Sequence, residues 1–362
     1  MGVGRSLTEG TEVAVEGFRV LDADAHVVEP AHVFAKWSAH GTAAMDLPPD
    51  TPFTMCGDLE LVRDQLDHGF DPPSYLRAMD AQGIDAAVVY PSIGLFVPFL
   101  PALGPAGSAA ACRSYNDWLA DWCGHAPSRL AGVALVPLAD ADLAVRETRH
   151  ASDIGLVGVL VRPNHLYDRN LGDPYYDELW SACQELGLTV SVHEGMGLPE
   201  AAGPTIGADR FRGFAARHAL SHPMEQMAAM ASLVLDGALE RHPDLLVAFL
   251  ESGTGWLPYW LDRLDGHIEW LTPERPTATE LFERQCVISS EADDSCIAAV
   301  IDHVGADHIV WASDFPHPDA IYPGAPEAFL TECQEHGVDA EDARTILWDT
   351  PLAFYGLEKR FT

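Results

Sequence analysis

Eight short runs of apolar, largely β-branched residues recur along this chain, and segments with helical periodicity separate them. The runs show continuous hydrophobicity instead of alternating polar and apolar residues, which is typical of strands covered on both faces. Eight strands that alternate with helices predict an α/β fold with a parallel sheet, and specifically a (β/α)8 TIM barrel. The predicted strands lie at 18–24, 84–90, 131–137, 156–162, 188–193, 245–251, 285–290 and 308–314.

Two of the intervening segments show the helical pattern most clearly. The segments 108–123 and 224–239 each place Met, Trp or aliphatic residues on one stripe, which we interpret as core packing. No G-x-G-x-x-G sequence follows the first predicted strand, which argues against a doubly wound, dinucleotide-binding fold.

The length of the chain suits one barrel domain with elaborated loops. It has 362 residues, no Pro/Ser-rich linker and no internal repeat. We therefore predict an N-terminal tail at 1–17 and a single domain at 18–362. Two long irregular stretches, 38–70 and 195–221, follow the first and fifth predicted strands. Loops on that side of a barrel carry substrate contacts, so both are candidates for a lid or a specificity loop.

The charge of the chain restricts its partners. It carries 21 Lys and Arg against 55 Asp and Glu, a formal net charge of −34. This excess argues against binding nucleic acid or adsorbing to anionic membranes.

We find no signal peptide and no apolar stretch of membrane-spanning length. The seven cysteines are scattered without a C-x-x-C pair, which suits a reducing environment. We therefore expect a cytoplasmic protein.

Metal-compatible side chains stand at the ends of three predicted strands. Asp24 and His26 alternate at the end of the first strand, so both side chains point the same way. His193 ends the fifth strand and Asp314 the eighth. In a (β/α)8 barrel these strand ends converge on one face, where two imidazoles and two carboxylates would suit Zn²⁺ or Mn²⁺.

Each of these residues also has a simpler interpretation. An aspartate at a strand end often caps the following helix, and His193 could be a hydrogen-bonded core histidine. The combination of residues on three strands is what favours one divalent metal site over these alternatives.

The sequence resembles a known family along residues 18–357. The resemblance rests on D-x-D-x-H-x-x-E-P at Asp22–Pro30, Pro163-Asn164, S-V-H-E-G at Ser191–Gly195 and W-A-S-D-F-P-H at Trp311–His317, together with 115–118, 127–132 and 241–245. These segments are similar to the amidohydrolase superfamily, in its branch around aminocarboxymuconate-semialdehyde decarboxylase and the nonoxidative aromatic-acid decarboxylases. The resemblance implies one divalent metal at Asp24, His26, His193 and Asp314.

One segment departs from the pattern of this branch. Its decarboxylases usually carry a His-Gly-Gly-like sequence after the sixth strand, where this chain has Glu251-Ser252-Gly253. Glu251 could act as a general acid or base, or orient a metal-bound histidine. His222 is the nearest substitute, placed just before the helix that joins the fifth and sixth strands. The alternative is that His222 only begins that helix.

Three further residues are candidates for substrate binding. Arg162, followed by Pro163 and Asn164, could bind a substrate carboxylate through two parallel hydrogen bonds. A salt bridge to the rim of the barrel is equally compatible with the sequence. His317 could line the pocket or brace its loop.

The resulting hypothesis is a metal-dependent enzyme that acts on a small organic acid. Nonoxidative decarboxylation of an aromatic or unsaturated carboxylic acid is the first expectation. Hydrolysis of an amide, ester or lactone is the alternative, in which Asp314 would accept a proton from metal-activated water. A catalytically silent binding barrel is a third possibility. Aromatic residues in the predicted helix 254–272 suggest a homodimer interface or further core packing.

Overall fold

The computed structural model describes residues 17–30, 32–34, 60–195, 206 and 210–361. The remaining residues include most of the predicted tail at 1–17 and parts of both predicted loops, which therefore lie outside the described residues. Helix α2 (Arg63–Asp67) falls in the first predicted loop, and α7 (Phe214–Leu235) begins inside the second.

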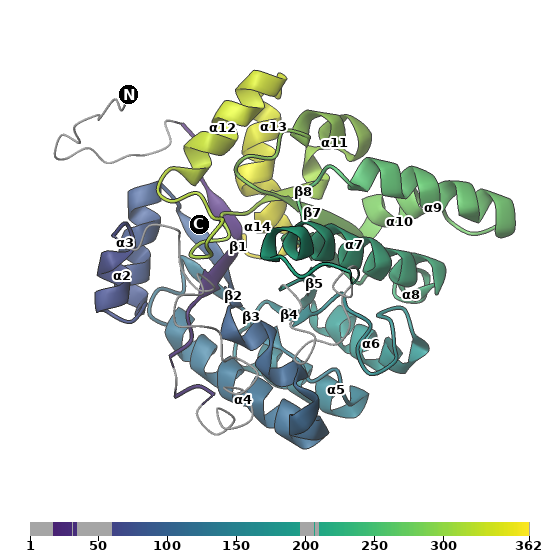
Figure 1. The fold of residues 1–362 in the computed structure, drawn as a ribbon, viewed down its shortest axis with the longest axis horizontal. Coiled ribbons are helices and arrows are strands. Elements are labelled where there is room, and N and C mark those ends of the chain that lie inside the picture. Colours follow the sequence, from purple (N-terminus) through teal and green to yellow (C-terminus); the bar gives the residue numbers. More distant parts are fainter. Residues whose placement is uncertain (1–16, 31, 35–59, 196–205, 207–209, 362) are drawn as a thin grey trace.

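Eight parallel strands form a barrel in sequence order, as predicted (Figure 1). Each neighbouring pair from β1–β2 to β7–β8 is parallel. The seam between β8 and β1 is joined beyond β8, where the Asp314 amide donates to the Asp24 carbonyl at 3.0 Å and the His26 amide to Phe315 at 2.7 Å. The strands are β1 Leu21–Val27, β2 Ala86–Pro91, β3 Leu130–Leu135, β4 Gly158–Val161, β5 Thr189–His193, β6 Val247–Leu250, β7 Cys286–Ser290 and β8 Ile309–Trp311.

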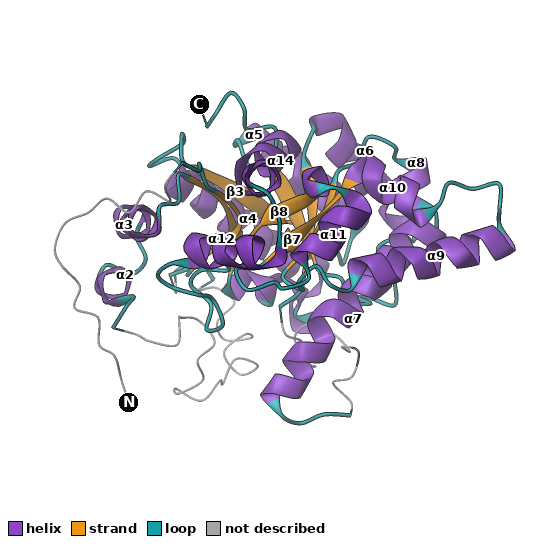
Figure 2. Ribbon diagram, turned by 90° about the horizontal axis from the view of Figure 1, so that it is seen from above, coloured by secondary structure: helices purple, strands orange, loops and turns teal. Residues whose placement is uncertain are grey.

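Helices surround the strands on the outside of the barrel (Figures 1 and 2). Every strand residue is buried, which explains the continuous hydrophobic runs in the sequence. The other α-helices are α3 Pro72–Gln82, α4 Gly104–Cys123, α5 Ala141–Asp153, α6 Asp177–Leu186, α8 Ala238–Arg241, α9 Leu257–Leu271, α10 Ala278–Gln285, α11 Ile297–Val304, α12 Ala325–His336, α13 Ala340–Arg344 and α14 Thr350–Phe354, with a π-helix at Thr345–Asp349.

The structure corrects the boundary of the first strand. The prediction ended it at Asp24, but β1 continues to Val27 with every residue buried. The pairing of β1 with β2 shifts between Asp22 and Ala25, so the polar residues lie at an irregularity within the strand. The strand therefore includes Asp24 and His26, whose side chains are buried against one another.

The structure also corrects the position of His222. It lies inside α7, which begins eight residues earlier at Phe214. Pro223 follows His222 directly, and proline is normally favoured only in the first turn of a helix. Here proline is instead accommodated in the interior of a long helix. The second predicted helix, 224–239, is split at Gly237, which adopts a left-handed conformation with φ of 81° before α8.

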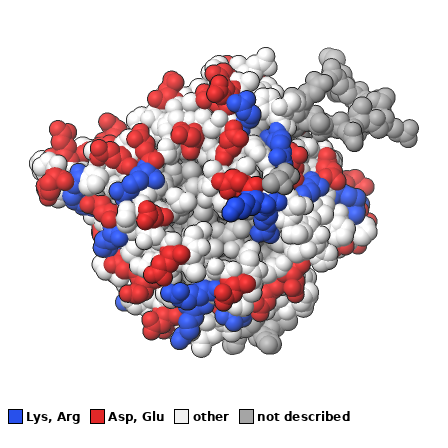
Figure 3. Space-filling model, turned by 180° about the vertical axis from the view of Figure 1, so that it is seen from behind, with Lys and Arg blue, Asp and Glu red and all other residues white. Residues whose placement is uncertain are grey.

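On the face of the molecule seen in Figure 3, acidic side chains are more widespread than basic ones, in line with the net charge of −34. Among the described residues no single helix is long and apolar enough to cross a membrane. The helices at 93–99 and 101–123, which are bent by 51° relative to each other, have the length and apolar composition of a membrane span only when taken together.

Candidate metal and catalytic site

Four acidic and imidazole side chains meet where β1, β5 and β8 end. Asp24 Oδ1 lies 3.2 Å from Nε2 of His193 and 3.4 Å from Nε2 of His26. His26 Nε2 lies 3.3 Å from Asp314 Oδ1. All four side chains are buried. The structure thus brings together the residues predicted from three distant parts of the sequence.

The hydrogen bonds of the two histidines point one nitrogen of each ring at this cluster. His26 Nδ1 is 2.8 Å from the Pro91 carbonyl, and His193 Nδ1 is 2.5 Å from the Glu194 carbonyl. Because a carbonyl oxygen only accepts, each Nδ1 carries a proton and donates. Each Nε2 therefore faces Asp24, which is the placement of a metal-ligand nitrogen.

Two buried atoms of the cluster lack hydrogen-bond partners. They are His26 Nε2 and Asp314 Oδ1, although this oxygen also forms an ion pair with His317 Nδ1 at 2.7 Å. An unprotonated nitrogen opposite a carboxylate oxygen is unfavourable unless a proton or a cation lies between them. Although burial opposes it, Asp24 and Asp314 hold the pKa of His26 well above its ordinary value. The donor set of Asp24, His26 and His193, close enough to share one ion, fits a divalent cation in that place.

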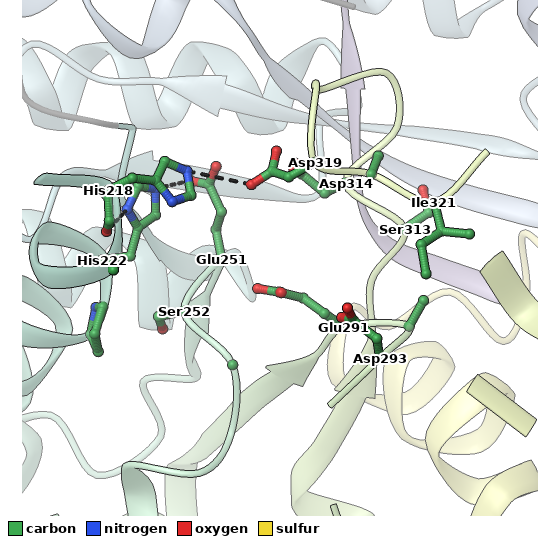
Figure 4. Close-up of a pocket in the computed structure, with 15 residues that line it drawn as sticks. His218, His222, Glu251, Ser252, Glu291, Asp293, Ser313, Asp314, Asp319 and Ile321 are labelled. Atoms are coloured by element: carbon green, nitrogen blue, oxygen red, sulfur yellow. Dashed lines mark hydrogen bonds and ion pairs between the residues drawn. The ribbon is translucent and has the colours of Figure 1, made fainter. Parts of the chain in front are cut away.

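Backbone conformation aims two of the acidic side chains. Glu251 follows β6 with φ of 55°, and Asp314 lies beyond β8 with φ of 53°. Residues other than glycine rarely adopt this left-handed backbone conformation, and those that do cluster at functional sites. Both carboxylates lie in the same cavity (Figure 4).

Glu251 and His222 form a pair beside the cluster. Glu251 Oε2 lies 3.3 Å from Nδ1 of His193 and 3.6 Å from Nε2 of His222. His222 Nδ1 faces the His218 carbonyl at 3.0 Å, which leaves Nε2 toward Glu251. Neither Glu251 Oε2 nor His222 Nε2 has a hydrogen-bond partner in the described structure. Burial raises the pKa of Glu251 well above its ordinary value. The structure thus places the two alternatives for the missing histidine side by side.

A cavity of about 280 Å³ opens onto Asp314, Glu251 and His222 (Figure 4). Its wall comes from α7 and from the segments that follow β6, β7 and β8. The lining residues are His218, Ala219, His222, Pro223, Glu251, Ser252, Gly253, Glu291, Ala292, Asp293, Ser313, Asp314, Asp319, Ala320 and Ile321.

Arg162 and Asn164 do not line this cavity in the described structure. The Arg162 side chain is fully buried, and its guanidinium donates to Glu194 at 3.2 Å, to Asn164 Oδ1 at 2.8 Å and to the Leu95 carbonyl at 2.9 Å. It also donates to the Gly195 carbonyl. Asn164 Nδ2 in turn donates to Glu194 at 3.1 Å. Arg162 thus forms the salt bridge at the barrel rim that the sequence analysis gave as the alternative to substrate binding.

His317 is held against Asp314. Its Nδ1 lies 2.7 Å from Asp314 Oδ1, and its Nε2 lies 3.2 Å from Ser92 Oγ. The ring lies against that of His26 with 4.0 Å between centroids and an angle of 32° between the ring planes. Burial, together with the charge of His26, lowers the pKa of His317, while Asp314 opposes this shift. His317 therefore contacts the metal-compatible cluster and is absent from the cavity lining.

Sequence reasoning missed several residues of the site. Asp22 accepts hydrogen bonds from the Ser313 amide, at 3.0 Å, and from its hydroxyl, and so ties β1 to the segment that carries Asp314. Burial raises the pKa of Asp22 to about 7. The repeated D-x-D spacing was a usable signal for Asp22. Glu291 and Asp319 stand in loops without a recognisable pattern, so only the fold shows that they line the cavity.

Comparison with known proteins points to one family. The family model described as Amidohydrolase matches residues 21–357. The chain is 27% identical over 266 residues to gamma-resorcylate decarboxylase of Polaromonas sp., covering 67% of this chain and 76% of the relative. It is 21% identical over 332 residues to 2-amino-3-carboxymuconate-6-semialdehyde decarboxylase of Dictyostelium discoideum, covering 89% and 87%.

Solved structures agree on the fold. An amidohydrolase from Mycobacterium avium subsp. paratuberculosis matches with a TM-score of 0.77 and 22% identity, covering 94% of this chain and 100% of that one. A 2,6-dihydroxybenzoate decarboxylase from Rhizobium gives 0.70 and 22%, covering 94% and 99%. A dihydroxybenzoic acid decarboxylase from Polaromonas sp., with bound manganese and 2-nitroresorcinol, gives 0.68 and 20%, covering 94% and 97%.

Proposed function

The chain belongs to the amidohydrolase family, and from that premise we propose that it is a metal-dependent, nonoxidative decarboxylase. Its substrate would be a small aromatic or unsaturated carboxylic acid. Curated relatives that align with most of this chain are decarboxylases of such acids. The observation that carries the proposal is the buried cluster of two histidines and two aspartates, in which His26 Nε2 faces Asp314 Oδ1 at 3.3 Å with no hydrogen bond between them.

One divalent ion, Zn²⁺ or Mn²⁺, is the proposed cofactor. Asp24, His26, His193 and Asp314 would hold it, and two structural neighbours are described with bound manganese. When bound, such an ion would hold the substrate carboxylate and an adjacent oxygen and stabilise developing negative charge. The hydrogen bonds from His26 and His193 to backbone carbonyls keep both ligand nitrogens oriented.

Glu251 and His222 are the proposed proton-handling pair. Decarboxylation breaks the bond between the substrate carbon and its carboxylate, CO₂ leaves, and the carbon keeps the electron pair and takes up a proton. Glu251 lies at the cavity wall beside Asp314 and can supply this proton from its carboxyl group. His222, 3.6 Å away, is placed to return a proton to Glu251.

Hydrolysis is the second candidate, and the Glu251-Ser252-Gly253 segment favours it. The histidine expected there in a decarboxylase is absent. In hydrolysis Asp314 would accept a proton from the attacking water. His317 and then His26 keep the pKa of Asp314 below its ordinary value against the effect of burial, so its carboxylate is ionised and able to accept.

Product analysis of the metal-loaded protein decides between the two reactions. We expect CO₂ release from a dihydroxybenzoate or a muconate-like acid, in amounts equal to the decarboxylated product. Incorporation of labelled water into a cleaved amide, ester or lactone, without CO₂, would instead establish the hydrolase. Protein that retains no stoichiometric metal even after addition of Zn²⁺ or Mn²⁺ would favour a silent binding barrel.

We also propose a cytoplasmic homodimer. Tyr259 and Trp270 on α9 are 61% and 76% exposed, and aromatic side chains are enriched at protein interfaces. Trp256 and Trp260 on the same segment pack inward against the core, which leaves Tyr259 and Trp270 as the candidate interface residues. The six cysteines of the described residues are all unpaired, which suits a reducing compartment. Light scattering of a Tyr259→Ser/Trp270→Ser variant would test the interface.

A further inference from the structure

Helix α7 carries a proline in its interior, directly after one residue of the proposed proton-handling pair. Pro223 divides the helix into an N-terminal segment, 214–222, which ends at His222, and a C-terminal segment, 224–235. Proline has no N–H to donate to the carbonyl four residues earlier, here Ala219, and its ring crowds that carbonyl. Sharp bends in long helices concentrate at such positions. The helix is therefore weakest where it borders the cavity, because Ala219 and Pro223 both line it.

The C-terminal segment of α7 is fixed to the barrel. The buried Gln226 donates through Nε2 to the carbonyls of Val192 and Leu250, at 2.8 Å each, and so joins the ends of β5 and β6. Trp260 Nε1 on α9 donates to the Met227 carbonyl at 2.9 Å. This segment can move only if these hydrogen bonds break.

The N-terminal segment of α7 is much less embedded. All of residues 215–220 are partly or largely exposed, whereas Ser221 and His222 are buried. Figure 2 shows the beginning of α7 projecting away from the barrel. Segments with few buried contacts open at a low cost in free energy. The N-terminal segment can therefore move about Pro223 while the C-terminal segment stays in place.

An ion pair connects the N-terminal segment to the loop that follows β8. Asp319 Oδ2 lies 3.4 Å from His218 Nε2, and Figure 4 marks this contact with a dashed line. The His218 side chain is 31% exposed and that of Asp319 is 58% exposed. Ion pairs between groups that contact water stabilise a structure only weakly. The contact can therefore form and break without unfolding the helix.

The position of His222 links this ion pair to the chemistry of the site. His222 belongs to the N-terminal segment and moves with it, whereas Glu251 follows β6 and stays with the barrel. The rings of His218 and His222 lie 4.1 Å apart between centroids, and His222 Nδ1 donates to the His218 carbonyl at 3.0 Å. The placement of His222 against Glu251 thus depends on whether Asp319 holds His218.

The facing atoms of His222 and Glu251 indicate that the N-terminal segment can close further. His222 Nε2 and Glu251 Oε2 are 3.6 Å apart. This separation exceeds the ordinary length of about 3 Å for a hydrogen bond between nitrogen and oxygen. Both atoms are buried without a hydrogen-bond partner in the described structure, a condition that is rare for buried polar atoms. A small inward rotation of the segment would let them bond to each other.

Resting on the proposed function, we propose that His218 and Asp319 are positioning residues, which hold the N-terminal segment of α7 closed about Pro223 so that His222 faces Glu251. Opening of the segment admits the substrate to the cavity. Closing then completes the proton-handling pair beside the bound substrate, so that the site is fully assembled only when it is occupied.

Hydrogen exchange of the manganese-loaded protein tests the movement without turnover. The backbone amides of 218–222 report on the N-terminal segment, and those of 226–235 on the C-terminal segment. Pro223→Ala restores the missing amide and stiffens the helix, whereas Asp319→Asn removes the ion pair. The control is Asp117→Asn, which removes a partly exposed ion pair between α4 and α5, where Asp117 Oδ1 lies 2.6 Å from His150 Nε2.

We expect the amides of 218–222 to exchange as one unit, at least about tenfold faster than those of 226–235. Pro223→Ala should slow their exchange by about tenfold, because alanine is far more favourable than proline inside a helix. Asp319→Asn should accelerate it by about threefold, since an exposed ion pair is weak. Neither variant should alter 226–235, and the control should alter neither segment. Uniform exchange along α7, a gradual rise in rate toward its first residue, or no response to either variant would overturn the inference.

Steady-state rates of the same proteins test the positioning role. Asp319→Asn should lower kcat by about threefold with KM nearly unchanged, because the substrate still binds but His222 faces Glu251 for less of the time. Asp319→Glu, which keeps a carboxylate, should recover most of this loss. An unchanged kcat in Asp319→Asn would contradict the positioning role. The expected exchange pattern in a wild-type protein that releases no CO₂ from any acid would support the movement of α7 while contradicting decarboxylation.

Discussion

Two buried polar clusters lie near the end of β5, and they differ in whether their polar atoms have hydrogen-bond partners within the cluster. In the cluster of Arg162, Glu194 and Asn164, the guanidinium and both carboxylate oxygens have hydrogen-bond partners. In the cluster of His26 and Asp314, Nε2 and Oδ1 face each other at 3.3 Å without a hydrogen bond. Both clusters are almost inaccessible to solvent.

This difference distinguishes a cluster that stabilises the fold from one that is a candidate for metal binding and catalysis. Buried polar groups that satisfy one another hold the chain in place, as Arg162 does by fixing the end of β5. Buried groups that converge without partners are stable only if something else occupies the space between them. The two clusters meet at Glu194, whose carbonyl accepts the proton of His193 and whose carboxylate binds Arg162. The satisfied cluster therefore orients a member of the unsatisfied one.

The largest expected effect comes from Asp314. Replacement of Asp314 by Asn should abolish turnover, with a loss of about a thousandfold or more, because the amide cannot replace an ionised ligand or proton acceptor. Steady-state rates at saturating metal would measure this. Near-normal turnover would remove Asp314 from the mechanism. The Asp262→Asn variant, on the outer surface of α9, is the matched control.

Replacement of Arg162 should lower the stability of the fold, whereas replacement of Asp314 should lower activity. Arg162→Met is expected to lower the free energy of unfolding by about 3–5 kcal/mol, since it leaves Glu194 buried without its partner. Urea denaturation of the metal-free protein would measure it. The double variant Arg162→Met/Glu194→Met should recover much of the loss, because an apolar pair leaves no buried charge. A loss below about 1 kcal/mol in the single variant would remove the distinction between the clusters.

His222 should affect the rate of proton transfer without affecting metal binding. His222→Gln removes the group that can exchange a proton with Glu251 but keeps a polar side chain of similar size. We expect kcat to fall by about a hundredfold, with metal content and KM largely unchanged. A fall in metal content together with activity would instead indicate that His222 supports the cluster structurally.

The smallest effect is a pH dependence at Glu291. Its pKa in the folded protein is raised from 4.5 to about 8, so the folded state retains a proton that the unfolded chain has lost between these values. The stabilising contribution is thus complete below about pH 4.5 and is lost as the pH rises through about 8. In denaturation at several pH values, Glu291→Gln should show a smaller decline of stability across this window than wild type. Identical slopes would contradict the assignment.

The fold could be predicted from the sequence because barrel strands buried on both faces leave an uninterrupted apolar signal. All eight predicted strands correspond to observed ones, and the family resemblance is confirmed. Boundaries were less predictable where polar residues are buried. β1 continues past Asp24 because its acidic and imidazole side chains contact one another and so need no solvent.

The site could be predicted only in part, since residues at strand ends are placed by topology and loop residues are not. Asp24, His26, His193 and Asp314 converge because parallel strands end on one face. Whether Arg162 faced a ligand or Glu194 depended on tertiary contacts that no spacing encodes. The same is true of Glu291, which lies near the cluster only because β7 adjoins β8.

Anomalous X-ray scattering from crystals of the protein grown with manganese tests the central claim most directly. The account predicts one strong anomalous peak within coordination distance of Asp24, His26, His193 and Asp314. Crystals in which those side chains bond only to one another or to water, with manganese absent or bound elsewhere, would contradict it.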